Sequence, residues 1–484
     1  LTNRAIDTPT ITHPSFVGKI LNIGLKQTAY ELNETTFFKN TQGEAIALNT
    51  GSILYTKEQP PSQENRFFFS RINGQMHSFT LSQALVSNYL NRLTSKDLIF
   101  QNTAFPLFAL DGNLASLDIR NAKFKQFPAV ERREALWLSN SHFRLKESHQ
   151  NIPADTCGTL YRNLTNNEIR FCFFNHNNQS TQVSIESNKV PELFEPIQSN
   201  RLVLCESPVD ALSFAQLNPE MPEEHRLYIA TCGTPAKYQM EHIQHLLNRN
   251  PSAEVVIAQD GDNAGIRFAI NYLGLKHPKQ NDGFSLTPYI AYSAPPISIQ
   301  SAQQLMGASE NLKGSTEKEE VHSRDNFMKG QNHLKLEITN LLDGQSPNAL
   351  KQQNETYVSD LTNRLNKFVT KEGNEFKARA SELSHFQTHD RGKLFTQAVI
   401  SFPNDTNMLI RALNMLSETI NQKQTHPLFR ICRPSRSQKD FNEVLQQRKG
   451  EKLPESSLLK LTTLYSSDLT LNLQSEKSQK KLSI

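Results

Sequence analysis

Two short apolar runs that end in acidic residues constrain the fold of this chain more than any other feature. Residues 202–205 are apolar and are followed by Glu206, and residues 255–258 are apolar and lead to Asp260 and Asp262. Continuous apolar runs of this length suit strands that are buried on both faces of a parallel sheet. Ligand sites of such α/β sheets lie at the carboxyl ends of the strands. The sequence therefore predicts that these carboxylates meet at one edge of a parallel sheet.

Carboxylates that converge in this way repel one another unless a cation neutralises them. Asp210 lies four residues after Glu206, in the first turn of a helix expected over 209–217, and can reach the same place. Hard oxygen ligands of this kind suit Mg²⁺ or Mn²⁺, and paired metal ions of this kind serve phosphoryl transfer. We therefore expect a divalent metal site formed by Glu206, Asp210, Asp260 and Asp262.

The ordered motifs resemble the Toprim domain shared by bacterial primases, topoisomerases and several nucleases. Residues 229–234 are similar to the middle strand and Gly-Thr turn of that family. Within the family, the Asp-Gly-Asp-x-Ala-Gly pattern at 260–265 and the Lys-Asp-rich segment at 439–443 resemble the bacterial replicative primase. The resemblance implies an α/β, Rossmann-like core. It also implies that Glu206, Asp260 and Asp262 are catalytic residues. Asp440 would be one further metal ligand.

The last motif departs from the family pattern. The family usually has a second Asp two residues after the first, and this chain has Asn442 at that position. The change removes one negative charge from the expected site. Glu443 is the adjacent carboxylate that could replace it.

The segment before the Toprim-like motifs also resembles the primase core. Residues 102–120 read as a strand, an Asp-Gly turn and a strand that ends in Arg, and residues 137–140 fall where the family has an Asn-Ser element. The same arrangement occurs in Toprim proteins of mobilisable elements and plasmids. In the family this subdomain guides template and nucleoside triphosphates, and basic side chains neutralise phosphates. The residues expected to bind nucleic acid or nucleotide are Arg120, Lys123, Lys125, Asn140 and Lys439.

We divide the chain into six regions by motif and composition. They are a mixed α+β N-terminal region (1–100) with hairpins at 36–48 and 67–81 and a helix at 81–93, a primase-like basic subdomain (101–200), the Toprim domain (201–300), a linker and mainly helical insertion (301–425), the final Toprim segment (426–450) and a C-terminal tail (451–484).

The sequence after the Asp-Gly-Asp-x-Ala-Gly pattern at 260–265 allows two arrangements of the chain. In the first, the insertion over 301–425 splits the Toprim fold, and residues just before Lys439 form its last strand. In the second, residues 287–293 supply the last Toprim strand. Residues 397–445 then form a small β-α-β appendage, made of strands 398–402 and 428–432 and a helix at 407–420.

Composition narrows the class of protein. The net charge is +4, the pI is near 8.6 and the mean hydropathy is −0.54, so nucleic-acid binding must come from local clusters of basic residues. No apolar run approaches the roughly 20 residues of a membrane span. The five scattered cysteines favour neither disulfides nor a zinc ribbon, and we expect a cytoplasmic protein.

Three functions fit these motifs. The first is a primase-like nucleotidyltransferase that copies single-stranded DNA from nucleoside triphosphates, in mobile-element replication or mobilisation, with a helicase or relaxase as a partner. The second is a metal-dependent Toprim nuclease. Such nucleases generally pair Toprim with an ATPase domain, and the sequence has no Gly-x-x-x-x-Gly-Lys-Ser/Thr pattern. The third is a non-catalytic DNA-binding mobilisation factor, which would have no need for clustered carboxylates.

Overall fold

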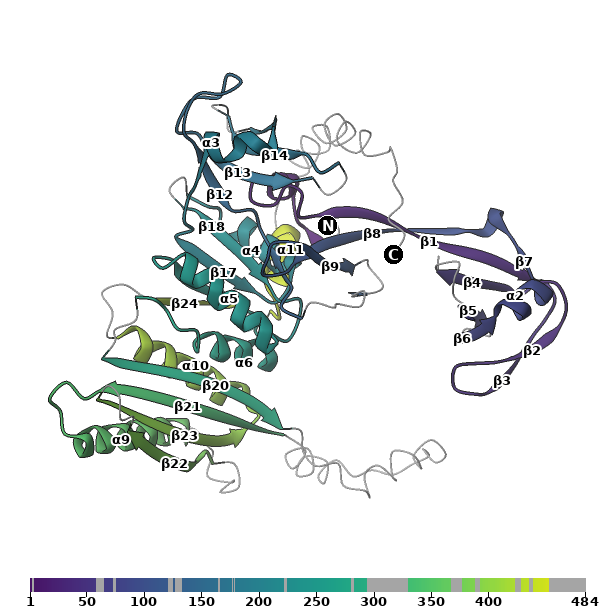
Figure 1. Ribbon diagram of the computed structural model, residues 1–484. Helices are drawn as coiled ribbons and strands as arrows, with labels where there is room; N and C mark the ends of the chain where they lie inside the picture. Colours follow the sequence, from purple (N-terminus) through teal and green to yellow (C-terminus); the bar gives the residue numbers. More distant parts are fainter. Residues whose placement is uncertain are drawn as a thin grey trace, which may run out of the picture.

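The computed structural model describes most of the chain as a set of connected sheets with flanking helices (Figure 1). It describes residues 1–451 except 2–3, 58–64, 73–74, 121–124, 127–132, 164–165, 176, 178, 222–223, 280–282, 294–329, 367–376, 388–391, 423–427 and 435–437. The predicted tail lies outside the described residues, apart from its first residue. Within the described residues, no helix combines the length and apolar character that crossing a membrane requires.

The centre of the molecule is a parallel sheet built from the apolar runs. Four parallel strands lie in the order β24 (Phe429–Cys432), β19 (Glu254–Ala258), β17 (Arg201–Cys205) and β18 (Arg226–Ala230). Their alternate side chains point to opposite faces, and both faces are buried. The prediction of doubly buried parallel strands is therefore confirmed.

Helices cover both faces of these strands. On one face, α5 (Lys237–Arg249), α6 (Asn263–Tyr272) and α10 (Thr406–Asn421) pack against side chains such as Leu204 and Ile257. On the other, α4 (Pro208–Leu217) and α11 (Phe441–Glu451) pack against side chains such as Val203 and Val256. The helices expected over 209–217, 239–247 and 264–273 are thus present with ends shifted by one or two residues.

The sheet continues beyond β18 with antiparallel strands. β11 (Leu136–Leu138) joins β18 to β8 (Leu98–Phe108), and β8 pairs with β9 (Leu114–Arg120) and with the long β1 (Leu21–Leu32). β10 (Lys125–Gln126) pairs with β9. The predicted strand, turn and strand over 102–120 are therefore confirmed.

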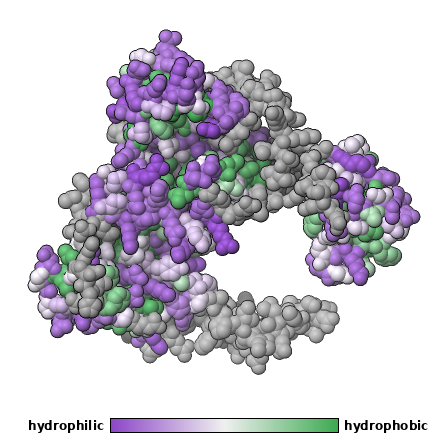
Figure 2. Space-filling model, viewed as in Figure 1, coloured by the Kyte–Doolittle hydropathy of each residue, from purple (hydrophilic) through white to green (hydrophobic). Residues whose placement is uncertain are grey.

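The far ends of β1 and β8 carry the sheet into an N-terminal lobe. This lobe contains β4 (Ile53–Lys57), β5 (Asn65–Ile72), β6 (Gln75–Ser82), α2 (Gln83–Tyr89) and the β2–β3 hairpin (Thr36–Lys39, Ala45–Leu48). Both predicted hairpins are confirmed. The predicted helix over 81–93 is shorter because Leu90–Arg92 forms β7 against β1. Figure 2 shows an open gap between this lobe and the rest of the molecule.

A second sheet packs beside the N-terminal segment, which begins with the short helix α1 (Thr8–Ile11). Its order is β15 (Ser180–Ile185), β14 (Ile169–Phe174), β13 (Cys157–Arg162), β12 (His142–Leu145) and β16 (Phe194–Pro196), and α3 (Val190–Leu193) precedes β16. The predicted basic subdomain is thus divided between this sheet and the central one.

The region predicted to be a mainly helical insertion contains three strands as well as two helices among its described residues. β20 (Phe284–Ser293), β21 (Gln331–Leu341), β23 (Lys393–Pro403) and β22 (Arg379–Gln387) form an antiparallel sheet in that order. Only α9 (Pro347–Asn366) and α10 are helical among its described residues. Leu334, Leu336 and Ile338 are buried at every second position, which is the period of a strand.

The same sheet decides between the two arrangements left open by the sequence. β20 pairs with β21 and not with the parallel strands, whereas β24 pairs with β19 in parallel. The last parallel strand therefore comes from residues 429–432, and the insertion separates it from β19, as in the first arrangement. α10 packs against both α6 and β24 and so joins the inserted sheet to the core (Figure 1).

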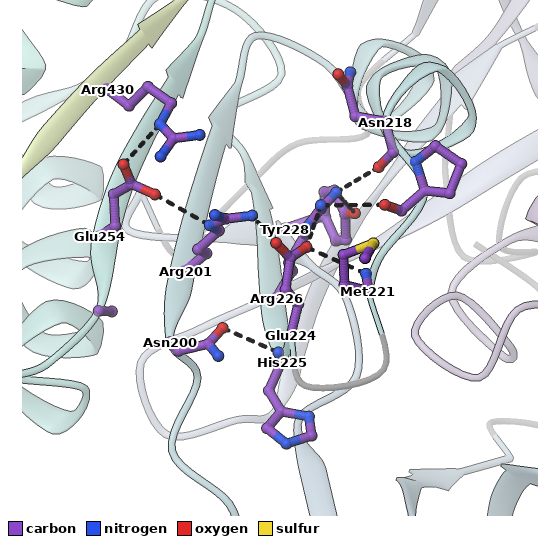
Figure 3. A network of polar contacts seen from close by, with 12 residues as sticks. Asn200, Arg201, Asn218, Met221, Glu224, His225, Arg226, Tyr228, Glu254 and Arg430 are labelled. Atoms are coloured by element: carbon purple, nitrogen blue, oxygen red, sulfur yellow. Dashed lines mark hydrogen bonds and ion pairs between the residues drawn. The ribbon is translucent and has the colours of Figure 1, made fainter.

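The amino ends of the parallel strands are tied together by paired charges (Figure 3). Arg201 at the start of β17 pairs with Glu224 and, at 3.0 Å from Nε to Oε2, with Glu254 at the start of β19. Glu224 also pairs with Arg226 of β18, and Glu254 accepts from Arg430 Nε of β24 at 2.7 Å. One network of alternating charge thus spans all four strands.

Candidate functional site

The opposite, carboxyl ends of the same strands hold the predicted acidic residues. Cys205 of β17 lies beside Ala258 of β19 in parallel register. Glu206 therefore leaves the sheet at the same edge as the turn that carries Asp260 and Asp262. Glu206 is half-buried, Asp260 is buried and Asp262 is half-buried.

Two of the carboxylates also begin helices. Asp210 is buried in the first turn of α4, where its Oδ2 accepts a 2.6 Å hydrogen bond from Ser207 Oγ. Asp262 is the N-cap of α6, and its Oδ1 accepts from the Gly265 N–H at 2.9 Å. Carboxylates are stabilised at helix N-termini by orphan N–H groups and the helix dipole. This local stabilisation holds both side chains at the edge of the sheet.

The pKa of Asp260 is strongly perturbed. Burial raises its pKa to about 9, and the neighbouring charges of Asp210, Glu206, Asp440 and Asp262 act in the same direction. Its Oδ1 is buried and has no hydrogen-bond partner among the described residues. A buried carboxylate oxygen without a donor is costly, and a cation would supply the missing partner.

Asp210 is perturbed in the same sense but less strongly. Burial raises its pKa to about 6, the Ser207 hydrogen bond lowers it, and the charges of Asp440 and Glu206 raise it. Arg120 of β9 lowers it by opposite charge. The segment before the parallel sheet therefore contributes a cation beside the carboxylates.

The Lys-Asp segment at 439–443, far along the chain, lies against the Asp-Gly-Asp turn. The Gly261 N–H donates to the Lys439 carbonyl at 2.6 Å, and a Cβ on Gly261 would lie 3.1 Å and 3.3 Å from the carbonyl oxygens of Gln438 and Lys439. Glycine at 261 therefore permits this close approach of two backbones. Asp440, half-buried, is brought near enough to influence both Asp210 and Asp260.

Lys439 places a positive charge at the rim of the cluster. Its Nζ lies 3.8 Å from Asp262 Oδ2. Desolvation lowers the pKa of Lys439, but the charges of Asp262, Asp260, Glu206 and Asp440 outweigh it and raise the pKa overall. Lys439 is thus a counter-ion of the cluster in this structure.

Asn442 and Glu443, two and three residues after Asp440, serve the fold. The buried Asn442 donates from Nδ2 to the Arg4 carbonyl at 2.7 Å and to Ser213 Oγ at 3.0 Å. Glu443 accepts from the Lys439 N–H at 2.6 Å. Asn442 therefore anchors α11 to α4 and the N-terminus. Glu443 shapes the turn, so its predicted role as a substitute carboxylate is not supported.

The residues predicted to bind nucleic acid or nucleotide lie in different surroundings. Arg120 pairs with the fully buried Asp118 at 2.7 Å. The sequence prediction missed Asp118, although the Asp-x-Arg spacing places both side chains on one face of a strand. Lys125 lies opposite Arg120 in the β9–β10 register, and Lys123 lies outside the described residues. Asn140 is buried and donates from Nδ2 to the Pro14 and Val17 carbonyls, so its amide holds the N-terminal segment, and the prediction that it binds nucleotide is not supported.

The site is not preassembled for a metal ion. Among the residues that the structure describes, no three His, Cys, Asp or Glu side chains are gathered closely enough to hold one. The donor set nevertheless fits a divalent cation, because the carboxylates raise one another's pKa values and Asp260 Oδ1 lacks a partner. All five cysteines are free thiols. Cys205 lies next to the carboxylates, but burial and the charges of Asp210 and Asp260 raise its pKa, so it stays protonated and is a poor ligand for a softer metal.

Comparison with known proteins identifies the parallel core. A Toprim-like family matches residues 203–286, which run from β17 into β20. No curated protein and no solved structure matches the chain. Toprim domains in general bind divalent metals such as Mg²⁺ and occur in enzymes that act on nucleic acid, including primases, nucleases and topoisomerases. The chain thus contains a Toprim-like domain at residues 203–286, with its carboxylates at the carboxyl edge of the parallel sheet.

Proposed function

We propose that this protein is a primase-like nucleotidyltransferase that makes short primers on single-stranded DNA. The observation that carries the proposal is the 2.6 Å hydrogen bond from the Gly261 N–H to the Lys439 carbonyl. It joins the Asp-Gly-Asp turn to a Lys-Asp segment from the far end of the chain. That pairing brings a cation and a further carboxylate to the Toprim-like edge.

Each residue of the site has a role in this proposal. Asp260, Asp262 and Glu206 would hold Mg²⁺ or Mn²⁺, with Asp210 and Asp440 completing the acidic set. The metal, when bound, stabilises the attacking and leaving oxygens of phosphoryl transfer. Glu206, half-buried at the edge, is the carboxylate that can also take up or release a proton.

Two cations are placed to receive phosphates. Lys439 is exposed beside Asp262, so a metal that neutralises the carboxylates would free its ammonium for a triphosphate. Arg120 lies near Asp210 but is oriented by Asp118. A guanidinium fixed in this way is suited to bidentate phosphate contact.

Arg120 is also the reason to favour synthesis over degradation. It ends the strand that follows the Asp-Gly turn, in the segment that resembles the primase core. The structure brings that segment to the carboxylates through the pairing of β9 with β8 and of β8 with β11. Action in mobile-element replication or mobilisation, with a helicase or relaxase partner, is part of the same proposal.

The decisive experiment is incubation with a single-stranded DNA template, labelled nucleotides and Mn²⁺, followed by separation of the products on a sequencing gel. Short template-dependent oligomers would support the proposal. Degradation of the template without synthesis would replace it with a metal-dependent nuclease. The Asp260→Ala variant serves as the matched control, since any product it still makes comes from elsewhere.

A further inference from the structure

The inserted antiparallel sheet has one covered face and one open face. Leu334, Leu336 and Ile338 of β21 point to the covered face, where α9 and α10 pack. The alternating residues of the same strand, among them Lys335 and Glu337, are exposed. Figure 1 shows the four strands side by side below α10.

Aromatic side chains stand on the open face. Tyr289 of β20 is 54% exposed and Phe386 of β22 is 46% exposed. Phe386 stacks on Phe395 of β23 with ring centroids 5.5 Å apart and planes 6° apart. Planar side chains on an open sheet offer faces on which unpaired bases can stack.

Basic side chains share the same face. Lys335 lies opposite Tyr289 in the β20–β21 register, and Arg379 lies opposite Ser401 in the β22–β23 register. Lys393 also lies on this side of β23, two residues before Phe395. Glu337 carries the opposite charge, and its carboxylate accepts from Gln397 Nε2 at 3.3 Å. The mixture of aromatic and mainly basic groups matches a single strand with a phosphate backbone.

The end of the sheet at which β23 finishes is tied to the helix that carries the carboxylate site. There, Asn404 accepts from Arg267 Nη1 of α6 at 2.8 Å, and Thr406 donates to Asn263 Oδ1 at 2.6 Å. Thr406 and the Asp262–Ala264 turn line an open hollow of about 440 Å³. This hollow therefore lies just beyond the end of β23, between α10 and the turn that carries Asp262.

We propose that the open face of β20, β21, β23 and β22 binds single-stranded DNA and leads it to the carboxylate site. This inference rests on the proposed function and names the surface that would hold the template. Tyr289, Phe386 and Phe395 supply stacking, and Lys335, Arg379 and Lys393 supply phosphate contacts.

The test is the affinity of the full chain for a short labelled oligodeoxythymidine, measured by fluorescence anisotropy in EDTA without nucleotides. The double variant Tyr289→Ala/Phe386→Ala should bind at least about tenfold more weakly, because each stacked base contributes about 1–3 kcal/mol. The matched control is Phe37→Ala, which removes an aromatic ring 69% exposed on β2 of the N-terminal lobe. It should bind like the wild type.

A second measurement identifies the contact directly. An oligonucleotide that contains 5-iodouracil should form photocrosslinks to Tyr289, Phe386 or Phe395, mapped by mass spectrometry. Crosslinks confined to other residues, or unchanged affinity of the double variant, would overturn the proposal. The open face would then be a candidate surface for a protein partner. Tighter, face-dependent binding of RNA of the same sequence would overturn the choice of DNA.

These outcomes are separate from those of the synthesis assay. Loss of DNA binding in the double variant would support the face even if the wild type made no primers. If the double variant bound DNA with normal affinity and still made primers, the proposed primase activity would be supported and DNA binding by the open face would be rejected.

Discussion

The two ends of the parallel sheet use charge in opposite ways. At the amino ends, Arg201, Glu224, Arg226, Glu254 and Arg430 alternate in sign and pair directly. At the carboxyl ends, carboxylates face one another with fewer cations between them.

The pKa values record this difference. Burial by itself would raise the pKa of Glu224, but Arg226 and Arg201 lower it below its usual value. Burial and, after it, the charges of the neighbouring carboxylates together raise the pKa of Asp260 to about 9. The paired end stabilises the fold, whereas the acidic end is electrostatically incomplete without a cation. The same four strands thus stabilise the fold at their amino ends and carry the candidate functional groups at their carboxyl ends.

The largest effect is expected from Asp260→Ala at the acidic end. Loss of this buried ligand should reduce primer synthesis by at least about 100-fold, because divalent metal binding organises phosphoryl transfer. The gel assay described above measures the product, and anisotropy should show unchanged DNA affinity. Synthesis at the wild-type rate would remove Asp260 from the site.

Glu224→Gln tests the paired end. It leaves the buried Arg226 and the partly buried Arg201 without their shared carboxylate. We therefore expect a loss of about 2 kcal/mol in the free energy of unfolding. Urea denaturation followed by the fluorescence of Trp137, the single tryptophan and a neighbour of β18, measures it.

The control is Glu195→Gln, which breaks an exposed pair with Arg144 and should change stability by less than about 0.5 kcal/mol. Activity per folded molecule should remain in both variants. An equal loss of stability in the two would contradict the importance of the paired network.

Asp260→Asn should instead stabilise the metal-free protein. Above the unfolded pKa of about 3.9 and below the folded pKa of about 9, the folded wild type holds a proton that the unfolded chain releases. Its stability therefore falls as pH rises through this window, whereas the variant lacks this titration.

The gain in the free energy of unfolding should be larger at pH 8 than at pH 5, by about 4 kcal/mol for the three pH units between them. Urea midpoints in EDTA at the two pH values measure it, and Mg²⁺ should stabilise only the wild type. A gain of the same size at both pH values would exclude the titration of Asp260 as its cause.

The smallest effect is expected from Gly261→Ala. The new Cβ would press on the carbonyl oxygens of Gln438 and Lys439 and displace the Lys-Asp segment, which should lower synthesis about tenfold. Lys439→Ala removes the ammonium at the same place. If both act through one contact, the double variant should lose less than the product of the single losses; multiplicative losses would show independent roles.

Much of the core was predictable from local patterns. The apolar runs before Glu206 and Asp260 form β17 and β19, since only doubly buried strands use such runs without alternation. The acidic residues follow the strands and so had to emerge at one edge. Asp118 escaped prediction although it stands two residues from Arg120 on one face of β9.

The inserted sheet was missed for a different reason. Leu361 and Leu365 are spaced as on one face of a helix and are buried in α9, but neighbouring segments of the insertion have a period of two. The buried Leu334, Leu336 and Ile338 carry that period plainly. Their pairing with β20 crosses a long intervening segment, so the strand partner had no local signal.

The sequence by itself determined which segments become buried strands and which carboxylates follow them, because burial and strand period depend on neighbouring residues. Only the tertiary structure decided that Gly261 meets Lys439, that Arg120 reaches Asp210 and that Asn140 turns to the N-terminal segment. Those contacts join residues far apart in the chain. They depend on how whole sheets pack, and local propensity does not encode that.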